Sequence, residues 1–282
     1  MYNLLYKEVN GRLKFLFYKN SKFIKNVKKK GKNMKKTMLI GVLLAFSVVL
    51  SGCGDTEQKK EEKATSSEHE EHLDYGKQSD WKVESGKFQS PINIDTTKAV
   101  PMKDEGALDL NYNDKVLNQV DNGHSIQVND EGIAEINGRQ FELKQFHFHA
   151  KSEHTLDGEY YPLEVHFVNQ SQAGRLAVIG VFFKEGKANP GFQAVLEHIK
   201  KGQESPSAES VDVASMLPDN RTYYHYLGSL TTPPLTENVE WYVMATPVEV
   251  SQQQIETFNT YYDGNNRKVQ PLNGRSILKH EE

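Results

Sequence analysis

The stretch KQFHFHAKSEH, residues 144 to 154, alternates aromatic and polar side chains in a way that predicts a β-strand. Successive side chains of a strand point to opposite faces, so residues two apart lie on one face, about 6.5 to 7 Å from each other. Gln145, His147 and His149 therefore share a face, and the two phenylalanines between them share the other. Two imidazoles placed in this way can converge on one metal ion, but two histidines alone do not define the chemistry.

A third histidine stands in a similar run further along the chain. In LEVHFV, residues 163 to 168, the side chains of Glu164, His166 and Val168 share one face of a second predicted strand. Pairing the two strands would bring three histidines together. That number of ligands is what a tight metal site needs when no other strong ligand is available.

The two strands also offer partners for the imidazoles, because Gln145 precedes His147 and Glu164 precedes His166 by two positions on the same face. A metal-bound imidazole commonly donates its second N–H to such an acceptor. Three neutral histidines leave an open tetrahedral position and suit zinc, although ligand type alone also allows copper or iron. A purely structural role explains any one of these histidines well, but explains the joint pattern poorly.

From about Leu73 onward, short β-rich runs are separated by Gly, Asn, Asp and Pro, which predicts a predominantly β domain. The runs are residues 107–112, 124–128, 139–149, 160–168, 175–184 and 238–245. Helical periodicity is clear in only two places, residues 189–200 and residues 251–262, the second opening with Ser251 as a helix N-cap. The expected fold is therefore α+β, with a few short helices.

The N-terminal part has the features of a secretion signal. Residues 1–36 contain twelve Lys or Arg and one acidic residue, and residues 38–50 form an apolar run too short to span a bilayer comfortably. LSGC, ending at Cys53, resembles the lipobox of bacterial lipoproteins. We therefore predict that residues 1–53 are a basic n-region and lipoprotein-type signal peptide, with lipidation at Cys53. The alternatives are an uncleaved anchor or a chance cysteine, and translation could also begin at Met34.

Residues 54–72 contain no aromatic or large aliphatic side chain, so we predict a charged, disordered tether before a folded domain at residues 73–282. The expected location is outside the cytoplasm, with the lipid holding the protein to the membrane. Without residues 1–53 the formal net charge falls from -4 to about -15, which argues against nucleic acid as a partner. Because Cys53 is the only cysteine, the domain can contain neither a disulfide nor a thiolate metal site.

From about Tyr75 to Arg275 the chain resembles the α-class carbonic anhydrases. The matching segments are QSPINI (89–94), DNGHSIQV (121–128), QFHFHAKSEHTLDG (145–158), LEVHFV (163–168), LAVIGVFF (176–183), GSLTTPPLTENVEWYV (228–243) and QPLNGR (270–275). The resemblance implies a single catalytic domain around a large, mostly antiparallel twisted sheet. It also implies zinc-dependent, reversible hydration of carbon dioxide to bicarbonate and a proton, by attack of a zinc-bound hydroxide.

Site residues follow from the resemblance by position. His147, His149 and His166 match the zinc ligands, with Gln145 and Glu164 as their hydrogen-bond partners. Thr231 matches the hydroxyl that accepts the hydroxide's proton and passes its own to Glu153, which makes Glu153 an orienting group instead of a ligand. His124, which follows an Asn-Gly turn signal, stands at the family's proton-shuttle position.

The resemblance also assigns the pocket that receives the substrate. Its apolar wall for carbon dioxide would be Val168, Val178, Leu230, Val239 and Trp241, with Thr232 as a polar contact to bicarbonate. Asn122 and Gln127 match positions that hold water, and Tyr75 is a further polar residue of the pocket. Without the family, the apolar residues would be ordinary core. Leu73 stands where the family has a tryptophan, and Leu235 stands where many extracellular relatives have a disulfide cysteine.

Two other functions fit parts of the sequence. A cupin metal site also begins H-x-H with a glutamate four residues later, but a cupin needs a glycine where Tyr160 stands and leaves SLTTPPLTE unexplained. A non-catalytic surface module related to the anhydrases would have no need of all three histidines together with Glu153 and Thr231. Serine hydrolase chemistry lacks a recognisable G-x-S-x-G motif.

Overall fold

The computed structural model describes residues 3–9, 12–18, 73–82, 86–112, 116–206 and 210–282. The chain divides into two units, Met1–Ser66 and Ser67–Glu282. In the first unit, β1 (Asn3–Val9) and β2 (Arg12–Tyr18) pair antiparallel. The predicted apolar signal segment, Cys53 and the predicted tether lie outside the described residues. Within the described ranges, no helix is long and apolar enough to cross a membrane.

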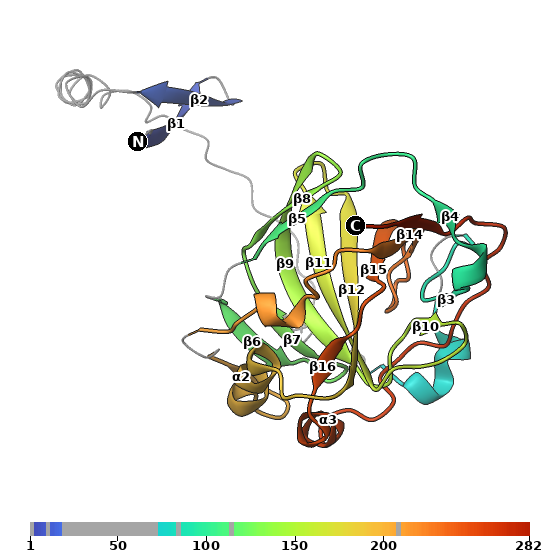
Figure 1. The fold of residues 1–282 in the computed structure, drawn as a ribbon. Coiled ribbons are helices and arrows are strands. Elements are labelled where there is room, and N and C mark those ends of the chain that lie inside the picture. Colours follow the sequence, from blue (N-terminus) through green and yellow to red (C-terminus); the bar gives the residue numbers. More distant parts are fainter. Residues whose placement is uncertain (1–2, 10–11, 19–72, 83–85, 113–115, 207–209) are drawn as a thin grey trace, which may run out of the picture. The chain divides into compact units, whose positions relative to one another are not determined.

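The second unit is built on one large sheet, which contains thirteen strands among the described residues (Figure 1). Its strands are β4 (Val100–Pro101), β5 (Leu108–Asn111), β6 (Asn118–Asp121), β7 (Ile126–Asn129), β8 (Ile133–Ile136), β9 (Arg139–His149), β11 (Leu163–Ser171), β12 (Leu176–Glu185), β13 (Glu204–Ser205), β14 (Tyr223–Ser229), β15 (Glu237–Met244), β16 (Val248–Val250) and β17 (Leu278–His280). A separate pair joins β3 (Asn93–Ile94) and β10 (Thr155–Leu156).

The sheet is mostly antiparallel. Its main path runs β13-β6-β7-β9-β11-β12-β15-β14-β17-β4, and β9, β11 and β12 form its centre. Among the described pairs, β12 runs parallel to β15 and β16, and β17 runs parallel to β4. The other pairs of this sheet are antiparallel. The predicted fold class is confirmed.

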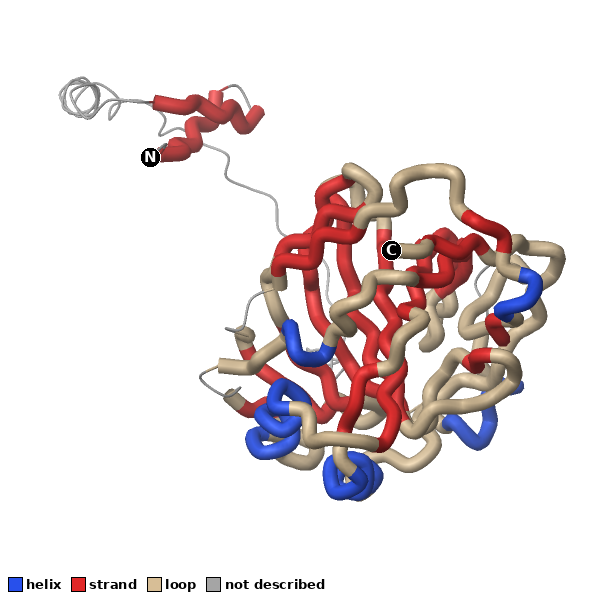
Figure 2. The backbone as a smooth tube through the Cα atoms, in the orientation of Figure 1, coloured by secondary structure: helices blue, strands red, loops and turns tan. Residues whose placement is uncertain are grey.

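Helices are short and lie at the margins of the strands (Figure 2). The α-helices are α2 (Pro190–His198) and α3 (Gln252–Asn259), and the 3₁₀ turns are Tyr75–Asp80, Thr96–Lys98 and Ala214–Met216. The Asn189 side chain caps α2 by accepting from the Phe192 N–H, and Ser251 opens α3 in a reciprocal capping box with Gln254. Both helices lie where the sequence predicts them.

Alternating side chains divide the sheet into two faces with separate apolar clusters. On one face, Phe146, Phe148 and Phe167 are fully buried and pack in a cluster that also contains Phe192 of α2 and Phe258 of α3. On the other face, a second cluster gathers around β12, β14 and β15 and includes the aromatic side chains Tyr226 and Trp241. The histidines of β9 and β11 therefore lie on the face that the helices do not cover.

Candidate metal centre

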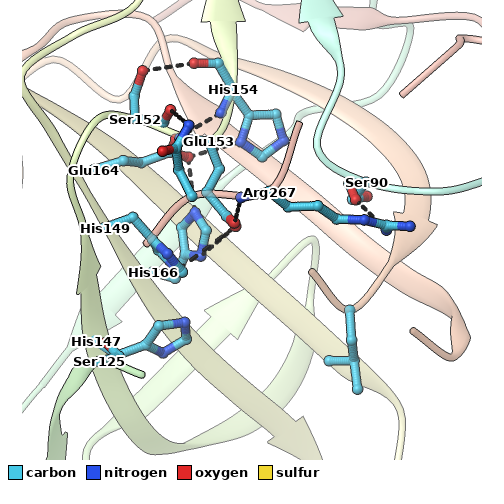
Figure 3. Close-up of polar contacts among 12 residues, drawn as sticks. Ser90, Ser125, His147, His149, Ser152, Glu153, His154, Glu164, His166 and Arg267 are labelled. Carbon is cyan, nitrogen blue, oxygen red and sulfur yellow. Dashed lines mark hydrogen bonds and ion pairs between the residues drawn. The ribbon is translucent and has the colours of Figure 1, made fainter. Parts of the chain in front are cut away.

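The pairing of β9 with β11 brings the three histidines together. His166 lies directly opposite His147, and Glu164 lies opposite His149. Ring centroids are 5.0 Å apart for His147 and His149, 5.3 Å for His147 and His166, and 4.6 Å for His149 and His166. One nitrogen from each ring lies within 4.8 Å of the other two, and Figure 3 shows the rings gathered in this way. The strand pattern of the sequence predicts this convergence.

Two of the imidazoles are oriented by side chains that precede them on the same strand. His147 Nδ1 lies 2.8 Å from Gln145 Oε1, and His166 Nε2 lies 2.9 Å from Glu164 Oε1. Because both oxygens accept, these nitrogens carry the protons. The nitrogens left for the centre are Nε2 of His147 and Nδ1 of His166.

The third imidazole is oriented by the backbone. His149 Nδ1 lies 2.8 Å from the carbonyl oxygen of Asn265, which comes from the C-terminal part of the chain. His149 Nε2 is buried and has no hydrogen-bond partner among the described residues. An unpartnered ring nitrogen in a buried site is costly unless another group binds it.

Burial keeps the three imidazoles neutral. It lowers the pKa of His147 well below the usual range, helped by the neighbouring histidines, and lowers the pKa of His149 to about 4. Burial also lowers the pKa of His166, against the opposing charge of Glu164. Three neutral imidazole nitrogens, each with its second nitrogen fixed, are a donor set that fits zinc.

The Glu164 carboxylate hydrogen-bonds to two histidines at once, His154 and His166. Its Oε1 lies 2.7 Å from His154 Nδ1 as well as 2.9 Å from His166 Nε2, and its Oε2 accepts from the backbone N–H groups of Glu153 and His154 (Figure 3). Burial alone would raise the pKa of Glu164, but its electrostatic interactions and hydrogen bonds with His154 and His166 hold that pKa well below its usual range. His154 therefore helps to hold the Glu164 carboxylate, which in turn orients His166.

Glu153 and Thr231 lie beside the histidines, and both are buried. Glu153 Oε1 accepts from the backbone N–H of Arg267 at 2.7 Å, while Oε2 lies 3.6 Å from His149 Nε2. Burial raises the pKa of the Glu153 carboxyl to about 7, while the charge of His166 and a hydrogen bond from Thr231 act to lower it. A bound cation would favour the ionised form further.

The predicted polar residues line the approach to the centre from β7 and the turn before it. Gln127 lies directly opposite His147, and Asn122 Nδ2 lies 3.5 Å from Gln127 Oε1. His124 is half-buried, and its proximity contributes to the lowered pKa of His147. Tyr75 places its hydroxyl near Glu153, and burial raises the pKa of that hydroxyl.

The predicted apolar wall forms one surface next to His166. Val178, Val239 and Trp241 are buried in the second apolar cluster, with Val168 and Leu230 packed against it. The Trp241 ring lies 4.8 Å from that of His166 between centroids. Val168 lies opposite Val178, which lies opposite Trp241 across neighbouring strands.

Two further predictions concern the edge of the site. Thr232 is half-buried directly after Thr231, and its carbonyl accepts from the Leu235 N–H at 3.0 Å. Leu73, which replaces the family tryptophan, is half-buried. Close by, Trp81 packs edge-on against Tyr75 with ring centroids 5.2 Å apart, so an aromatic pair is present in this segment.

Four contributors to the centre are absent from the sequence predictions. They are Asn265, which accepts from His149 through its backbone; Arg267, which donates to Glu153 through its backbone; His154, whose imidazole hydrogen-bonds to Glu164; and Gly180. A Cβ at Gly180 would lie 3.0 Å from Glu164 Oε1, so the glycine leaves room for that carboxylate. The segment QFHFHAKSEH does signal His154, but backbone groups have no side-chain signature.

The fold and site together are typical of metal-dependent enzymes that hold the metal with histidines on a β-sheet. The profile of the family described as eukaryotic-type carbonic anhydrase matches residues 75–281. A carbonic anhydrase of Pectobacterium carotovorum is 40% identical over 200 residues, covering 69% of this chain and 81% of the relative. One from a Nostoc strain is 38% identical over 201 residues, covering 69% and 76%.

Solved structures agree. The α-carbonic anhydrase from Thermovibrio ammonificans, in complex with the inhibitor sulfanilamide, superposes with a TM-score of 0.66 at 44% identity, covering 68% of this chain and 87% of the other. A carbonic anhydrase from Chlamydomonas reinhardtii gives 0.66 at 36% identity, covering 71% and 94%. The chain belongs to the α-carbonic anhydrase family and is an enzyme of carbon dioxide and bicarbonate interconversion, as the sequence predicts. The cupin alternative is wrong.

Proposed function

We propose that His147, His149 and His166 hold a catalytic zinc ion and that the enzyme uses it to hydrate carbon dioxide, with His124 exporting the proton. The proposal rests on three ring nitrogens that face one another: Nε2 of His147, Nε2 of His149 and Nδ1 of His166. The other nitrogen of each ring is hydrogen-bonded to a fixed acceptor. Preorganised neutral imidazoles of this kind favour metal binding, since they need neither deprotonation nor reorientation.

Zinc held by these three histidines would supply the nucleophile, because zinc lowers the pKa of water toward neutrality, an effect for which carbonic anhydrase is the standard example. Thr231 then sets the direction of attack. Its hydroxyl donates a hydrogen bond to Glu153, so its oxygen would be left to accept a hydrogen bond from the nucleophile. Glu153 is in turn held by the Arg267 backbone N–H at 2.7 Å. A fixed chain of donors and acceptors removes rotational freedom that would otherwise raise the barrier.

Carbon dioxide has no charge and no hydrogen-bond donor, so an apolar surface next to the nucleophile suits it. The wall of Val168, Val178, Leu230, Val239 and Trp241 offers such a surface beside His166. Thr232 would give bicarbonate a polar contact. Tyr75, Asn122 and Gln127 would hold the waters that connect the centre with solvent.

Each hydration cycle releases a proton that must leave the site. Histidine titrates near neutral pH, and His124 is half-buried on a turn, with its ring close enough to His147 to affect its pKa. The Asn122 side chain fixes this turn by accepting from the N–H groups of His124 and Ser125 at 3.2 and 2.8 Å. His124 is therefore well placed to pass protons between site and buffer.

The proposal is tested by comparing His149→Ala with His198→Ala. His198 is exposed on α2, and its one hydrogen bond within the part of the chain that the structure describes is to the carbonyl of Ala194. We expect His149→Ala to lose stoichiometric zinc and nearly all proton release from carbon dioxide, while His198→Ala keeps both. Full zinc content and full activity in His149→Ala would rule the proposed centre out.

We also propose that the enzyme works outside the cytoplasm, tethered through lipid on Cys53. The support is the sequence alone: a basic segment, a 13-residue apolar run at residues 38–50 and LSGC in order. In a bacterial host, Cys53→Ser should move the protein from the membrane fraction to the soluble or secreted fraction. Unchanged membrane association of this variant would contradict lipid anchoring at Cys53.

A further inference from the structure

A second charged cluster lies at the opposite end of β9 from the histidines. Arg139 begins the strand, and Arg175 follows the turn between β11 and β12. Both guanidinium groups bind the carboxylate of Glu240 on β15. Eight residues separate Arg139 from His147, which is about 26 Å along a strand. The cluster is therefore distinct from the metal centre.

Both carboxylate oxygens of Glu240 already accept two hydrogen bonds each. Arg139 donates to both of its oxygens at 2.9 and 2.6 Å, Arg175 donates to Oε1 at 3.0 Å, and the Tyr242 hydroxyl donates to Oε2 at 2.9 Å. Burial would raise the pKa of Glu240, but the hydrogen bonds from Arg139, Tyr242 and Arg175 hold it at about 2. The carboxylate is thus fully ionised and fully hydrogen-bonded near neutral pH.

The cluster carries one more positive charge than negative charge. The Nη1 atoms of Arg139 and Arg175 lie 2.9 and 3.0 Å from the same Glu240 oxygen, so they are at most about 5.9 Å apart. One carboxylate offsets only one of these two guanidinium groups, and the bidentate pair with Arg139 already satisfies it. Arg175 is therefore in excess of what the buried carboxylate requires.

A surface hollow of about 590 Å³ opens over the two arginines. Its other lining residues include Gln140, Ser171 and Gln172, and no carboxylate is among the lining residues that the structure describes. The Arg139 and Arg175 side chains are 44% and 55% exposed, so much of each guanidinium group remains available. Glu135 lies opposite Gln140 on β8 but does not line the hollow.

Additional donors point to the same kind of ligand. Ser171 Oγ accepts from the Arg175 N–H at 3.1 Å, which leaves its own proton free to donate. Arg175 makes a single side-chain hydrogen bond within the described residues, through Nη1, so its Nε and Nη2 protons remain for a ligand. A hollow with free guanidinium and hydroxyl donors and an uncompensated positive charge is complementary to an oxyanion.

We propose that this hollow binds a small oxyanion, such as bicarbonate or inorganic phosphate, between Arg175, Arg139 and Ser171. The bound anion offsets the excess positive charge of the cluster without displacing Glu240. In a domain whose overall charge is acidic, the excess positive charge of the cluster makes this hollow a selective place for an anion.

The test is a calorimetric titration of the purified zinc enzyme with inorganic phosphate and, separately, with bicarbonate at matched ionic strength. Anions that bind the zinc are common to all variants, so the readout is the difference between wild type and Arg175→Gln. We expect at least a 10-fold weaker affinity at one class of site in Arg175→Gln, with unchanged carbon dioxide hydration. The matched control is Lys184→Gln, whose side chain is 46% exposed in a surface ion pair with Glu249.

A second variant protects the test from indirect effects. Gln172→Glu places a carboxylate in the hollow without touching the contacts of Glu240, and it should abolish the same binding event. If the variants lose binding of phosphate but not of bicarbonate, the ligand is a tetrahedral oxyanion. If they lose binding of bicarbonate but not of phosphate, it is the planar one. Superimposable titrations of wild type, Arg175→Gln and Gln172→Glu with both anions would overturn the proposal.

Discussion

At the scale of single residues, the second nitrogen of each histidine decides how the centre is built. Gln145, Glu164 and the Asn265 carbonyl each hold one ring nitrogen, so the remaining nitrogen of each ring can only point inward. Glu164 is the most heavily used of these acceptors, since it also binds His154 and two backbone N–H groups. The geometry of the centre therefore depends on groups that never touch the metal.

His124→Ala tests the proposed proton exit. We expect turnover of carbon dioxide to fall by about 100-fold or more in weak buffer, within the range of a lost acid–base group, because proton export becomes limiting. Added imidazole should restore the rate, since it replaces the missing side chain in solution. His198→Ala serves as the matched control. A variant whose rate neither falls in weak buffer nor responds to imidazole would remove His124 from the mechanism.

At the scale of elements, β9, β12 and β15 are the strands that the sequence predicts best, each to within one residue at either end. The alternation in residues 139–149 predicts β9 to the residue, and the histidine positions follow from the same period of two. Two features could not be predicted in this way. β14 is buried on both faces over most of its length and so lacks polar alternation, and the Asn265 and Arg267 contacts come from backbone groups that any residue could supply.

Gly180→Ala tests how strongly β12 supports the centre. The new methyl group would lie 3.0 Å from Glu164 Oε1, and that carboxylate cannot move because four hydrogen bonds hold it. We expect the zinc affinity to fall by about 10- to 100-fold, as for other losses of ligand support. Competition with a coloured chelator measures this affinity.

The control for this substitution is Gly76→Ala. Its methyl group would also meet a carboxylate oxygen at 3.0 Å, but that oxygen belongs to Asp74, whose side chain is 54% exposed and held only by surface contacts with Gly76 and Lys77, so it can shift into solvent. Zinc affinity should therefore remain near that of the wild type. Equal affinities in both glycine variants would mean that Glu164 does not control the geometry of the centre.

At the scale of the whole molecule, one sheet holds both the histidine centre and the cluster of Arg139, Arg175 and Glu240, at opposite ends of β9. The domain reaches this arrangement without any disulfide, since its 210 predicted residues contain no cysteine. The buried Glu240 on β15 links β9 through Arg139 and the turn before β12 through Arg175, and it also accepts from Tyr242 of its own strand. Its ionisation should therefore contribute to the stability of the sheet.

The pH dependence of unfolding tests that contribution. The pKa of Glu240 falls from its ordinary value of 4.5 to about 2 on folding, so its stabilisation is complete above pH 4.5 and is lost as the pH falls toward 2. Between pH 6 and pH 3 this is a loss of about 2 kcal/mol. Urea unfolding of Glu240→Gln should lack this part of the pH dependence, while Glu249→Gln keeps it. The same pH dependence in wild type and Glu240→Gln would refute the assignment.

The central claim is that three histidines hold a zinc ion and that the enzyme uses it to hydrate carbon dioxide. The most direct test measures proton release from carbon dioxide with one enzyme preparation in three states. The measurements are made on the purified enzyme, after removal of metal by a chelator, and after return of one equivalent of zinc. The account predicts that activity is lost on chelation and returns with stoichiometric zinc. Activity that survives complete removal of the metal, or that zinc fails to restore to a folded protein, would contradict it.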